Sequence, residues 1–334
     1  MNKLAIIGAG MISYSHANAV KALPNAVLAA VADINETAAK KLALENDCLY
    51  FTDTGKMLRE VELDAVIICL PTFLHEKYVT LCAAHGVNVL CEKPVEMTAA
   101  ATENMLKAVN SAGIVFMVAQ VVRFWTGYAE IKEMADSGEL GEVYMAYASR
   151  CSVLQSWGNT WLMDPEQGGG AIQDMHVHDI DYLRYLLGPM DYVFCHANKD
   201  FTGCWNHVMT SIAYQNGQKA VAEAAFTMQE GYPFSMSLKI AATKATIEFY
   251  YRAGFCIGER DSLDAEIRIY RPGKKPLKKQ PGLYDAYTKQ LAYYLGCLEK
   301  RILPERVPQS ENLEVIKAVC AIKESAETKS IVKL

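Results

Sequence analysis

Apolar and polar positions follow two different patterns along the first third of the chain. Short apolar runs typical of buried strands cover residues 4–7, 27–32, 65–70, 87–91 and 114–118. Between them, near 13–22, 36–46, 73–85 and 98–112, apolar residues recur at helical intervals. Buried strands that alternate with helices predict an α/β fold with a doubly wound parallel sheet, covered by helices on both faces.

The pattern changes after residue 188. Short β-rich segments near 191–198, 207–214, 219–228, 235–240 and 245–250 follow one another, joined by turn signals such as Gln215-Asn216-Gly217. A chain of 334 residues is longer than most single domains. We therefore predict two domains, the first at 1–120 and the second at 121–334.

Composition narrows the class of protein. The net charge is −5 and no basic run is long enough to track a phosphate backbone, so nucleic-acid binding is not expected. No stretch approaches the ~18 apolar residues of a membrane span, and glycines interrupt the N-terminal apolar run. The ten cysteines include no C-x-x-C pair, and this usage favours a reducing, cytoplasmic location.

The first turn carries a dinucleotide-binding signal. Gly8 and Gly10 form G-x-G between an apolar strand and the helix predicted near 13–22, and Met11 and Ile12 lie directly before that helix. Such glycines let the backbone amides at the helix N-terminus approach a pyrophosphate. The third glycine of the usual pattern is replaced by Ser13, which is still small enough for close packing of helix on strand.

An acidic residue follows at the expected distance. Asp33 ends the second strand and is followed by Ile34 and Asn35, neither of which is a cation. A carboxylate at this place hydrogen-bonds the adenosine ribose hydroxyls and repels a 2′-phosphate. The expected cofactor is therefore NAD in preference to NADP.

Two further clusters lie where predicted parallel strands end. One runs through Leu70, Pro71 and Thr72 to His75, and the other is Glu92-Lys93-Pro94. Ligands of open α/β sheets bind beyond the carboxyl ends of the strands. We expect these residues beside the cofactor, with His75 either structural or adjacent to it.

The segment GGGAIQDMHVHDIDYLRYLLG, from Gly168 to Gly188, concentrates titratable groups. If it forms one helix, Asp174, His178 and Asp181 lie on one side of it, at i, i+4 and i+7. A carboxylate one turn from an imidazole can fix its tautomer and support its charged form. This arrangement predicts a catalytic base and its orienting partner.

A zinc site is the alternative for this segment, because His176 and His178 form H-x-H near Asp174. On a helix, however, alternate residues point about 200° apart, and no cysteine cluster supplies further ligands. We therefore expect no metal and interpret His176 as a packed or hydrogen-bonded histidine.

With these motifs in order, the chain resembles the glucose–fructose oxidoreductase/inositol dehydrogenase family (Gfo/Idh/MocA) over nearly its whole length. The shared pattern comprises the G-x-G turn, the acidic strand end, P-[TN]-x-x-H, E-K-P and G-G-G-x-x-x-D-x-x-x-H. The segment from Gln120 to Phe124 also resembles the passage between the two domains of the family.

The resemblance implies a Rossmann domain followed by an α/β domain with an open, mostly antiparallel sheet. The outer face of that sheet commonly mediates assembly, so a homodimer or homotetramer is expected. It also implies that Lys93, Asp174 and His178 form the catalytic group. Together the expected cofactor residues are Gly8, Gly10, Met11, Ile12, Asp33, Ile34, Leu70, Pro71, Thr72, His75, Glu92, Lys93 and Gln120.

The expected activity is NAD-dependent interconversion of a secondary alcohol and a ketone on a sugar, inositol or related polyol. Substrate contacts are expected from Lys93, Arg123, Trp161, Asp174 and His178, with further candidates at Gln155, Trp157, Asn159 and Asp181. Two alternatives stay open: an NAD-dependent glycoside hydrolase that oxidises the sugar transiently, and a catalytically silent nucleotide sensor.

Overall fold

The computed structural model describes residues 1–154, 160–253, 264–281 and 285–334, and every structural statement below concerns these ranges. The chain divides into two compact units. The first comprises Met1–Phe124 and Tyr284–Leu313, and the second comprises Trp125–Leu283 and Glu314–Leu334. The change near Phe124 lies close to the predicted boundary at 120, whereas the return of the later segment to the first unit was not predicted.

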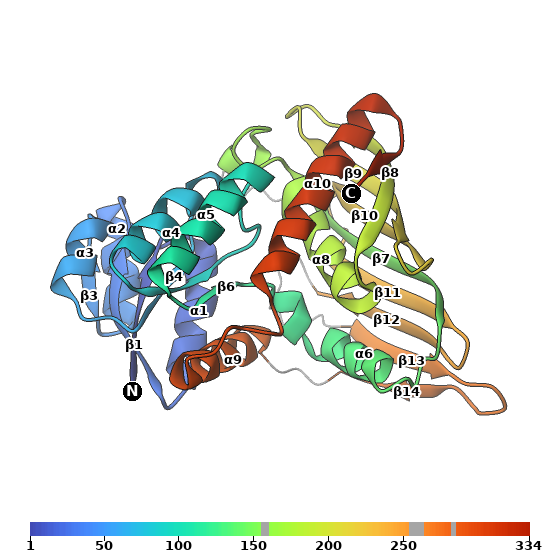
Figure 1. Ribbon diagram of the computed structural model, residues 1–334, viewed down its shortest axis with the longest axis horizontal. Coiled ribbons are helices and arrows are strands. Elements are labelled where there is room, and N and C mark those ends of the chain that lie inside the picture. The colour runs from blue at the N-terminus through green and yellow to red at the C-terminus, as the bar shows by residue number, and fades with distance from the viewer. Residues whose placement is uncertain (155–159, 254–263, 282–284) are drawn as a thin grey trace. The chain divides into compact units, whose positions relative to one another are not determined.

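The first unit contains a six-stranded parallel sheet with the order β3-β2-β1-β4-β5-β6 (Figure 1). This is the doubly wound order of dinucleotide-binding folds, so the predicted Rossmann sheet is confirmed. Its strands are β1 (Asn2–Ile7), β2 (Ala26–Ala32), β3 (Leu49–Phe51), β4 (Ala65–Ile68), β5 (Asn88–Cys91) and β6 (Phe116–Val118).

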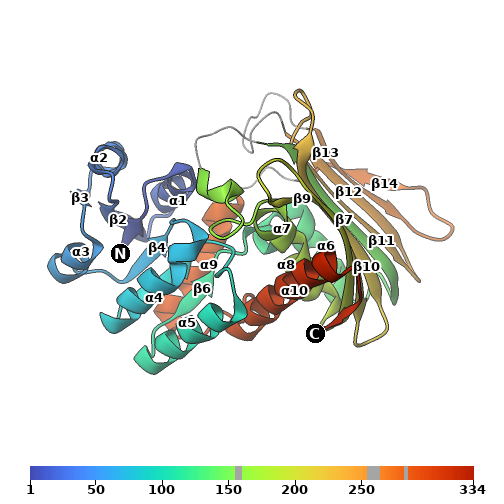
Figure 2. The ribbon, with the colours of Figure 1, turned by 90° about the horizontal axis from the view of Figure 1, so that it is seen from above.

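Helices cover both faces of this sheet (Figure 2). The connection from β1 to β2 and the connection from β4 to β5 run in opposite directions across the sheet. Because both are right-handed, α1 and α4 lie on opposite faces. α5 packs beside α4, and α9 packs beside α1. The helices of this unit are α1 (Met11–Ala22), α2 (Glu36–Glu45), α3 (Thr54–Glu60), α4 (His75–Ala84), α5 (Ala99–Ala112) and α9 (Ala286–Lys300), with 3₁₀ turns η1 (Thr72–Leu74) and η2 (Val121–Phe124).

The second unit contains a nine-stranded sheet with the order β14-β13-β12-β11-β7-β10-β9-β8-β15. Among the described strands of this unit, only β7 and β10 pair in parallel, so the predicted open, mostly antiparallel sheet is confirmed. Its strands are β7 (Val143–Val153), β8 (Met190–Lys199), β9 (Trp205–Tyr214), β10 (Lys219–Met228), β11 (Ser235–Ala242), β12 (Thr246–Arg252), β13 (Asp264–Tyr270), β14 (Leu277–Lys279) and β15 (Val332–Lys333).

The helices of the second unit lie against one face of its sheet (Figure 2). They are α6 (Thr126–Asp136), α7 (Ala171–Asp174) and α8 (His176–Leu187), joined by the later part of α10 (Gln309–Thr328), which begins in the first unit. The 3₁₀ turn η3 (Thr160–Met163) precedes α7 in the chain. Within the described ranges, no helix combines the length and apolar character needed to cross a membrane.

Candidate active site

The G-x-G turn joins β1 to α1, and its glycines place no side chain where a phosphate would approach. Gly8 has φ +98°, and a Cβ there would lie 2.4 Å from the carbonyl oxygen of Cys69, so only glycine fits. A Cβ on Gly10, which caps α1, would meet no heavy atom within 4 Å. This empty space beside a helix N-terminus fits the pyrophosphate of a dinucleotide.

Asp33 follows β2 and is fixed against the same turn. Its Oδ2 accepts a hydrogen bond from the backbone N of Ala9 at 2.6 Å, and its Oδ1 accepts one from Asn35 N at 2.7 Å. Each carboxylate oxygen keeps a second lone pair for a ribose hydroxyl. The negative charge is thereby held where the fingerprint requires it.

Apolar side chains surround these strand ends. Ile34 is 87% exposed and Met11 is 49% exposed, which leaves apolar surface available next to Asp33 and Gly10. Phe73, in η1 after β4, is 40% exposed and was missed by the sequence analysis. A large apolar residue in the turn that follows a predicted strand was the signal that could have identified it. Thr72 beside it is buried, and Leu70 and Pro71 are partly exposed.

The structure does not present His75 to a cofactor. The imidazole is fully buried, and its nitrogens lie 2.9 Å from Pro94 O and 2.9 Å from Leu70 O. Since both nitrogens face backbone carbonyl groups, neither has room for a nucleotide. We therefore reassign His75 from cofactor contact to the support of the turn that carries Lys93.

The E-K-P turn follows β5 and exposes one side chain. Glu92 and residues 94–96 are buried, whereas Lys93 is partly exposed. Glu92 Oε1 lies 2.7 Å from His16 Nε2 of α1, and Glu92 Oε2 accepts the backbone N–H of Lys93 at 3.0 Å. Burial opposes ionisation, but the hydrogen bond and charge of His16 lower the pKa of Glu92 overall, with help from Lys93. The Glu92 carboxylate therefore supports the turn from inside.

Gln120 and Arg123 are engaged within the first unit. The Gln120 side chain is buried and donates to Asn312 Oδ1 at 3.2 Å. Arg123 is fully buried, and its Nη1 donates to Glu311 Oε2 at 2.7 Å and to Arg306 O at 2.8 Å. A guanidinium with no exposed surface cannot contact a polyol, so we remove Arg123 from the proposed substrate residues.

In the second unit, the glycine turn before α7 is packed too closely for side chains. A Cβ on Gly168 would lie 2.4 Å from Trp161 O, and one on Gly170, which has φ +69°, would lie 2.3 Å from Asn206 Oδ1. That amide oxygen accepts the backbone N–H of Ala171 at 2.8 Å, at the start of α7. Asn206 of β9, which the sequence analysis did not single out, thus anchors the segment that leads to Asp174.

The segment 171–187 is not one uninterrupted helix, which corrects the sequence-based expectation. α7 ends at Asp174 and α8 begins at His176. At the junction, the backbone N of His178 donates to Met175 O at 3.3 Å, three residues back and not four. The solvent pattern nevertheless agrees with the proposed pair. From 171 to 183 every residue except Asp174 and His178 is buried. These two side chains therefore reach the surface together, four positions apart.

Buried contacts hold α8 against the sheet. Arg150 of β7 forms hydrogen bonds of 3.0 Å from Nε and Nη2 to the two carboxylate oxygens of Asp179. His176 is fully buried with its Nε2 2.8 Å from Thr210 Oγ1, and burial lowers the pKa of His176 to about 3. His176 thus has the packed, hydrogen-bonded role that its spacing suggested. No group of three potential metal ligands occurs in the described ranges.

The remaining substrate candidates have mixed positions. Trp161, in η3, is partly buried, and Asp181 is completely buried. Gln155, Trp157 and Asn159 lie outside the described residues. Lys93 belongs to the first unit, and Asp174 and His178 belong to the second.

Two family models match the chain. Residues 2–120 match an oxidoreductase family described by its NAD-binding Rossmann fold, and residues 128–248 match the Gfo/Idh/MocA C-terminal domain. The two matches follow one another in the order that the motifs predicted.

Individual proteins agree with these matches. The chain is 29% identical over 187 residues to 2,7-anhydro-N-acetylneuraminate hydratase of Mediterraneibacter gnavus, covering 56% of this chain and 49% of that protein. It is 29% identical over 243 residues to scyllo-inositol 2-dehydrogenase (NAD(+)) of Bacillus subtilis, covering 69% of each. The alignment thus spans about half the length of the first relative.

A solved structure resembles the whole fold. The aldose–aldose oxidoreductase of Caulobacter crescentus, complexed with glycerol, superposes with a TM-score of 0.88. The two chains share 20% sequence identity, and the superposition covers 100% of this chain and 99% of the other. At this identity the similarity establishes the fold alone.

Proposed function

Since the chain belongs to the Gfo/Idh/MocA family of oxidoreductases, we propose that it is an NAD-dependent enzyme that interconverts a secondary alcohol and a ketone on a sugar, inositol or related polyol. The observation that carries this proposal is the exposure pattern of the two motifs. Lys93 alone reaches the surface from the turn 92–96, and Asp174 and His178 alone do so from 171–183. Buried neighbours fix each backbone, and these three side chains are the ones that reach solvent from the two segments.

The cofactor proposal rests on the nucleotide turn. Bound nicotinamide would supply the hydride acceptor at the carbinol carbon. Gly8 and Gly10 would admit the pyrophosphate, and Asp33 would accept hydrogen bonds from the adenosine ribose. Because its carboxylate is held by Ala9 N and Asn35 N, it cannot easily turn away from a 2′-phosphate. This supports NAD over NADP, with Met11, Ile12, Ile34, Leu70, Pro71 and Thr72 forming the rest of the proposed contacts.

Proton transfer is the part of the reaction that the protein must supply. An alcohol hydroxyl does not ionise unaided near neutral pH, so a base must take its proton as the hydride leaves. We assign this role to an imidazole nitrogen of neutral His178, with Asp174 stabilising the imidazolium that forms. The Lys93 ammonium would donate a hydrogen bond to the same oxygen and stabilise its developing negative charge. Trp161 is retained as a candidate contact for the polyol.

A substrate screen tests this function. The protein would be mixed with NAD and separately with inositols, aldoses, sugar acids and nucleotide sugars, and NADH formation would be followed by absorbance. We expect at least one polyol to yield NADH and its ketone. If no compound does so, and if saturating NAD also leaves the thermal unfolding temperature unchanged, both the activity and the cofactor assignment are wrong, since a ligand that binds only the folded state must stabilise it.

A second function has one observation in its favour, the similarity to a hydratase. A hydratase adds or removes water without net electron transfer, and an NAD-dependent glycoside hydrolase would likewise regenerate its cofactor. The same Lys93, Asp174 and His178 could serve such a cycle. Turnover of anhydro sugars or aryl glycosides with no accumulation of NADH would favour this class, whereas stoichiometric NADH favours the dehydrogenase.

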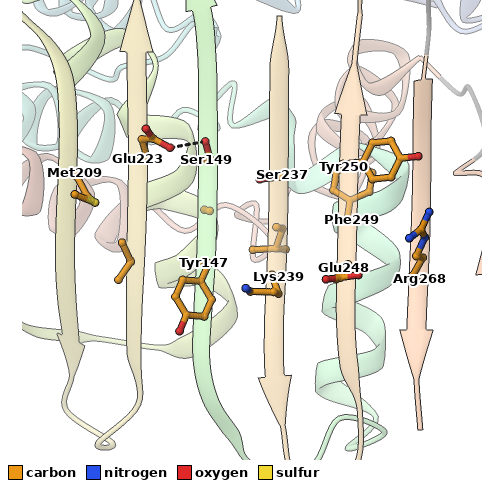
Figure 3. A pocket seen from close by; sticks show the side chains of 13 residues that line it. Tyr147, Ser149, Met209, Glu223, Ser237, Lys239, Glu248, Phe249, Tyr250 and Arg268 are labelled. Carbon is orange, nitrogen blue, oxygen red and sulfur yellow. Dashed lines mark hydrogen bonds between the residues drawn. The ribbon is translucent and has the colours of Figure 1, made fainter. Parts of the chain in front are cut away.

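We also propose that the chain assembles as a homodimer or homotetramer through the helix-free face of the second sheet. A shallow cavity of about 460 Å³ crosses this face from β9 to β13 (Figure 3). Met209 and Tyr147 are 49% and 40% exposed there, beside Glu223, Lys239, Glu248 and Arg268. Apolar surface mixed with charges of both signs suits contact with a second copy of the same face.

A further inference from the structure

The turn that carries Lys93 is held from two sides by buried histidines. His16 of α1 contacts the Glu92 side chain at 2.7 Å, while Nδ1 of His75 lies 2.9 Å from Pro94 O and 3.3 Å from Val95 O. One histidine therefore holds a side chain of the turn and the other faces its backbone. Between these two supports only Lys93 is exposed to solvent.

His75 also reaches the neighbouring strand. It is the first residue of α4, and its Nε2 lies 2.9 Å from Leu70 O, just beyond the end of β4. The ring thus spans the carboxyl ends of β4 and β5. At these ends the backbone has left the ladder of the sheet, so its carbonyl groups need other donors.

The two nitrogens of the His75 ring differ in the hydrogen bonds that they can donate. A carbonyl oxygen only accepts, so every hydrogen bond here requires an imidazole N–H as donor. Burial lowers the pKa of His75, against the opposing effect of the surrounding carbonyl groups, and a neutral ring has a single N–H. If the hydrogen is on Nδ1, it faces two carbonyl oxygens of the turn that carries Lys93. If it is on Nε2, it faces one carbonyl oxygen, that of Leu70.

We propose that His75 is a positioning residue for Lys93, holding through Nδ1 the backbone from which the ammonium projects. This inference rests on the proposed role of Lys93 at the substrate oxygen. His75 touches neither reactant, and its effect on the reaction passes through the placement of the Lys93 side chain.

Two amide substitutions separate the sides of the ring. In His75→Asn the amide nitrogen can take the place of Nδ1 and still donate to Pro94 O. In His75→Gln it can take the place of Nε2 and donate only to Leu70 O. We expect His75→Gln to lower kcat by roughly 10- to 100-fold, because misplacement by about 1 Å can cost about 10²-fold. His75→Asn should stay close to the wild type, and the Kd for NAD should be unchanged in both.

A measurement without cofactor reports the Lys93 side chain directly. Reductive methylation with ¹³C-formaldehyde keeps the lysine charge and gives each lysine its own NMR signal, with the Lys93 signal identified by its absence in Lys93→Arg. We expect this signal to shift in His75→Gln and to coincide with the wild type in His75→Asn. Thermal unfolding of both variants, and of His75→Leu, separates a local displacement from loss of the fold.

The outcomes distinguish this proposal from the proposed function. If no polyol is oxidised but the NMR signal moves as expected, the positioning role stands and the function fails. If both amide variants match the wild type in kcat and in the Lys93 signal, the positioning role is wrong. It is also wrong if His75→Gln lowers the residual activity of Lys93→Met by the same factor as in the wild type, because effects through one group do not multiply.

Discussion

Arg150 and Asp179 form a bidentate ion pair in which two guanidinium nitrogens each lie 3.0 Å from a carboxylate oxygen. Both residues are buried, Arg150 on the central strand β7 and Asp179 on α8. Asp179 directly follows His178 in the chain. The sheet of the second unit therefore fixes the helix at the residue next to the proposed base.

Replacing Asp179 with Asn should strongly destabilise the protein. The substitution leaves the Arg150 guanidinium buried without its counter-charge, a loss that costs about 3–5 kcal/mol in other proteins. Urea unfolding measures this loss as the change in the free energy of unfolding. The matched control is Glu314→Gln, which breaks the partly exposed Arg184–Glu314 pair and should cost about 0–1 kcal/mol. Equal losses in the two variants would contradict a fixing role for the buried pair.

Replacing His178 with Ala should remove catalysis and spare cofactor binding. Loss of a general base costs roughly 10²–10⁴-fold in rate, so kcat should fall by about that range. The Kd for NAD should hold, because the nucleotide residues are in the first unit. Steady-state kinetics and NADH fluorescence titration measure the two quantities. Full activity in His178→Ala would assign the proton transfer to another residue.

Replacing Asp33 with Asn should shift cofactor preference toward NADP. The amide keeps the shape of the carboxylate but removes the charge that opposes a 2′-phosphate. We expect the ratio of the Kd values for NADP and NAD to fall by about tenfold or more, equivalent to about 1.4 kcal/mol. Glu36→Gln removes a neighbouring exposed charge and serves as the control. If both variants change the ratio equally, the effect is one of net charge and not of the Asp33 position.

The burial of His176 should make the protein sensitive to acid. Its pKa is lowered to about 3 in the folded protein from 6.5 in the unfolded chain, so between these values only the unfolded state binds the proton. Its contribution to stability is complete above pH 6.5 and falls with decreasing pH by up to about 1.4 kcal/mol per unit. His176→Gln, which can still bond Thr210, should flatten urea-unfolding stability between about pH 6.5 and 4. The control His85→Gln, at an exposed position, should leave the pH dependence of unfolding stability as in the wild type.

Substituting the helix-free sheet face should dissociate the proposed assembly. Met209→Glu and Tyr147→Glu place new charges where we expect two copies to meet, and an unpaired charge in an interface is costly. Sedimentation equilibrium should then give the 37.0 kDa mass of one chain. Leu44→Glu, at a 73% exposed position on α2, should leave the assembly intact. A wild type that already sediments at the single-chain mass would refute this proposal directly.

Most local elements of the first unit could be predicted because their strands contain apolar runs, as in β2 and β4, and their helices have an apolar face. The missed elements, β3 with three residues and α3 with seven, are too short to show such a pattern. Leu49 and Tyr50 of β3 are also largely exposed at the edge of the sheet. The return of α9 to the first unit was also missed, since its pairing with α1 depends on contacts distant in the chain.

In the candidate site, spacing identified Asp174 and His178 but not their supports. The glycine turn is anchored by Asn206 of β9, 35 positions beyond Ala171 in the chain, and the segment divides at Met175, where no glycine or proline marks a break. Arg123 shows the opposite error. Its place in the sequence and the family resemblance suggested a substrate contact, but its partner Glu311 lies far along the chain and cannot be recognised from a local pattern.

The two outermost strands of the nine-stranded sheet are its shortest: β14 has three residues and β15 has two. Each edge also carries lysine, at Lys278 and Lys279 on one side and Lys333 on the other. Such blunt, charged borders discourage the addition of a strand from another molecule. Growth into filaments by edge-to-edge β-pairing is thus suppressed, and an oligomer built on this sheet should form through its face.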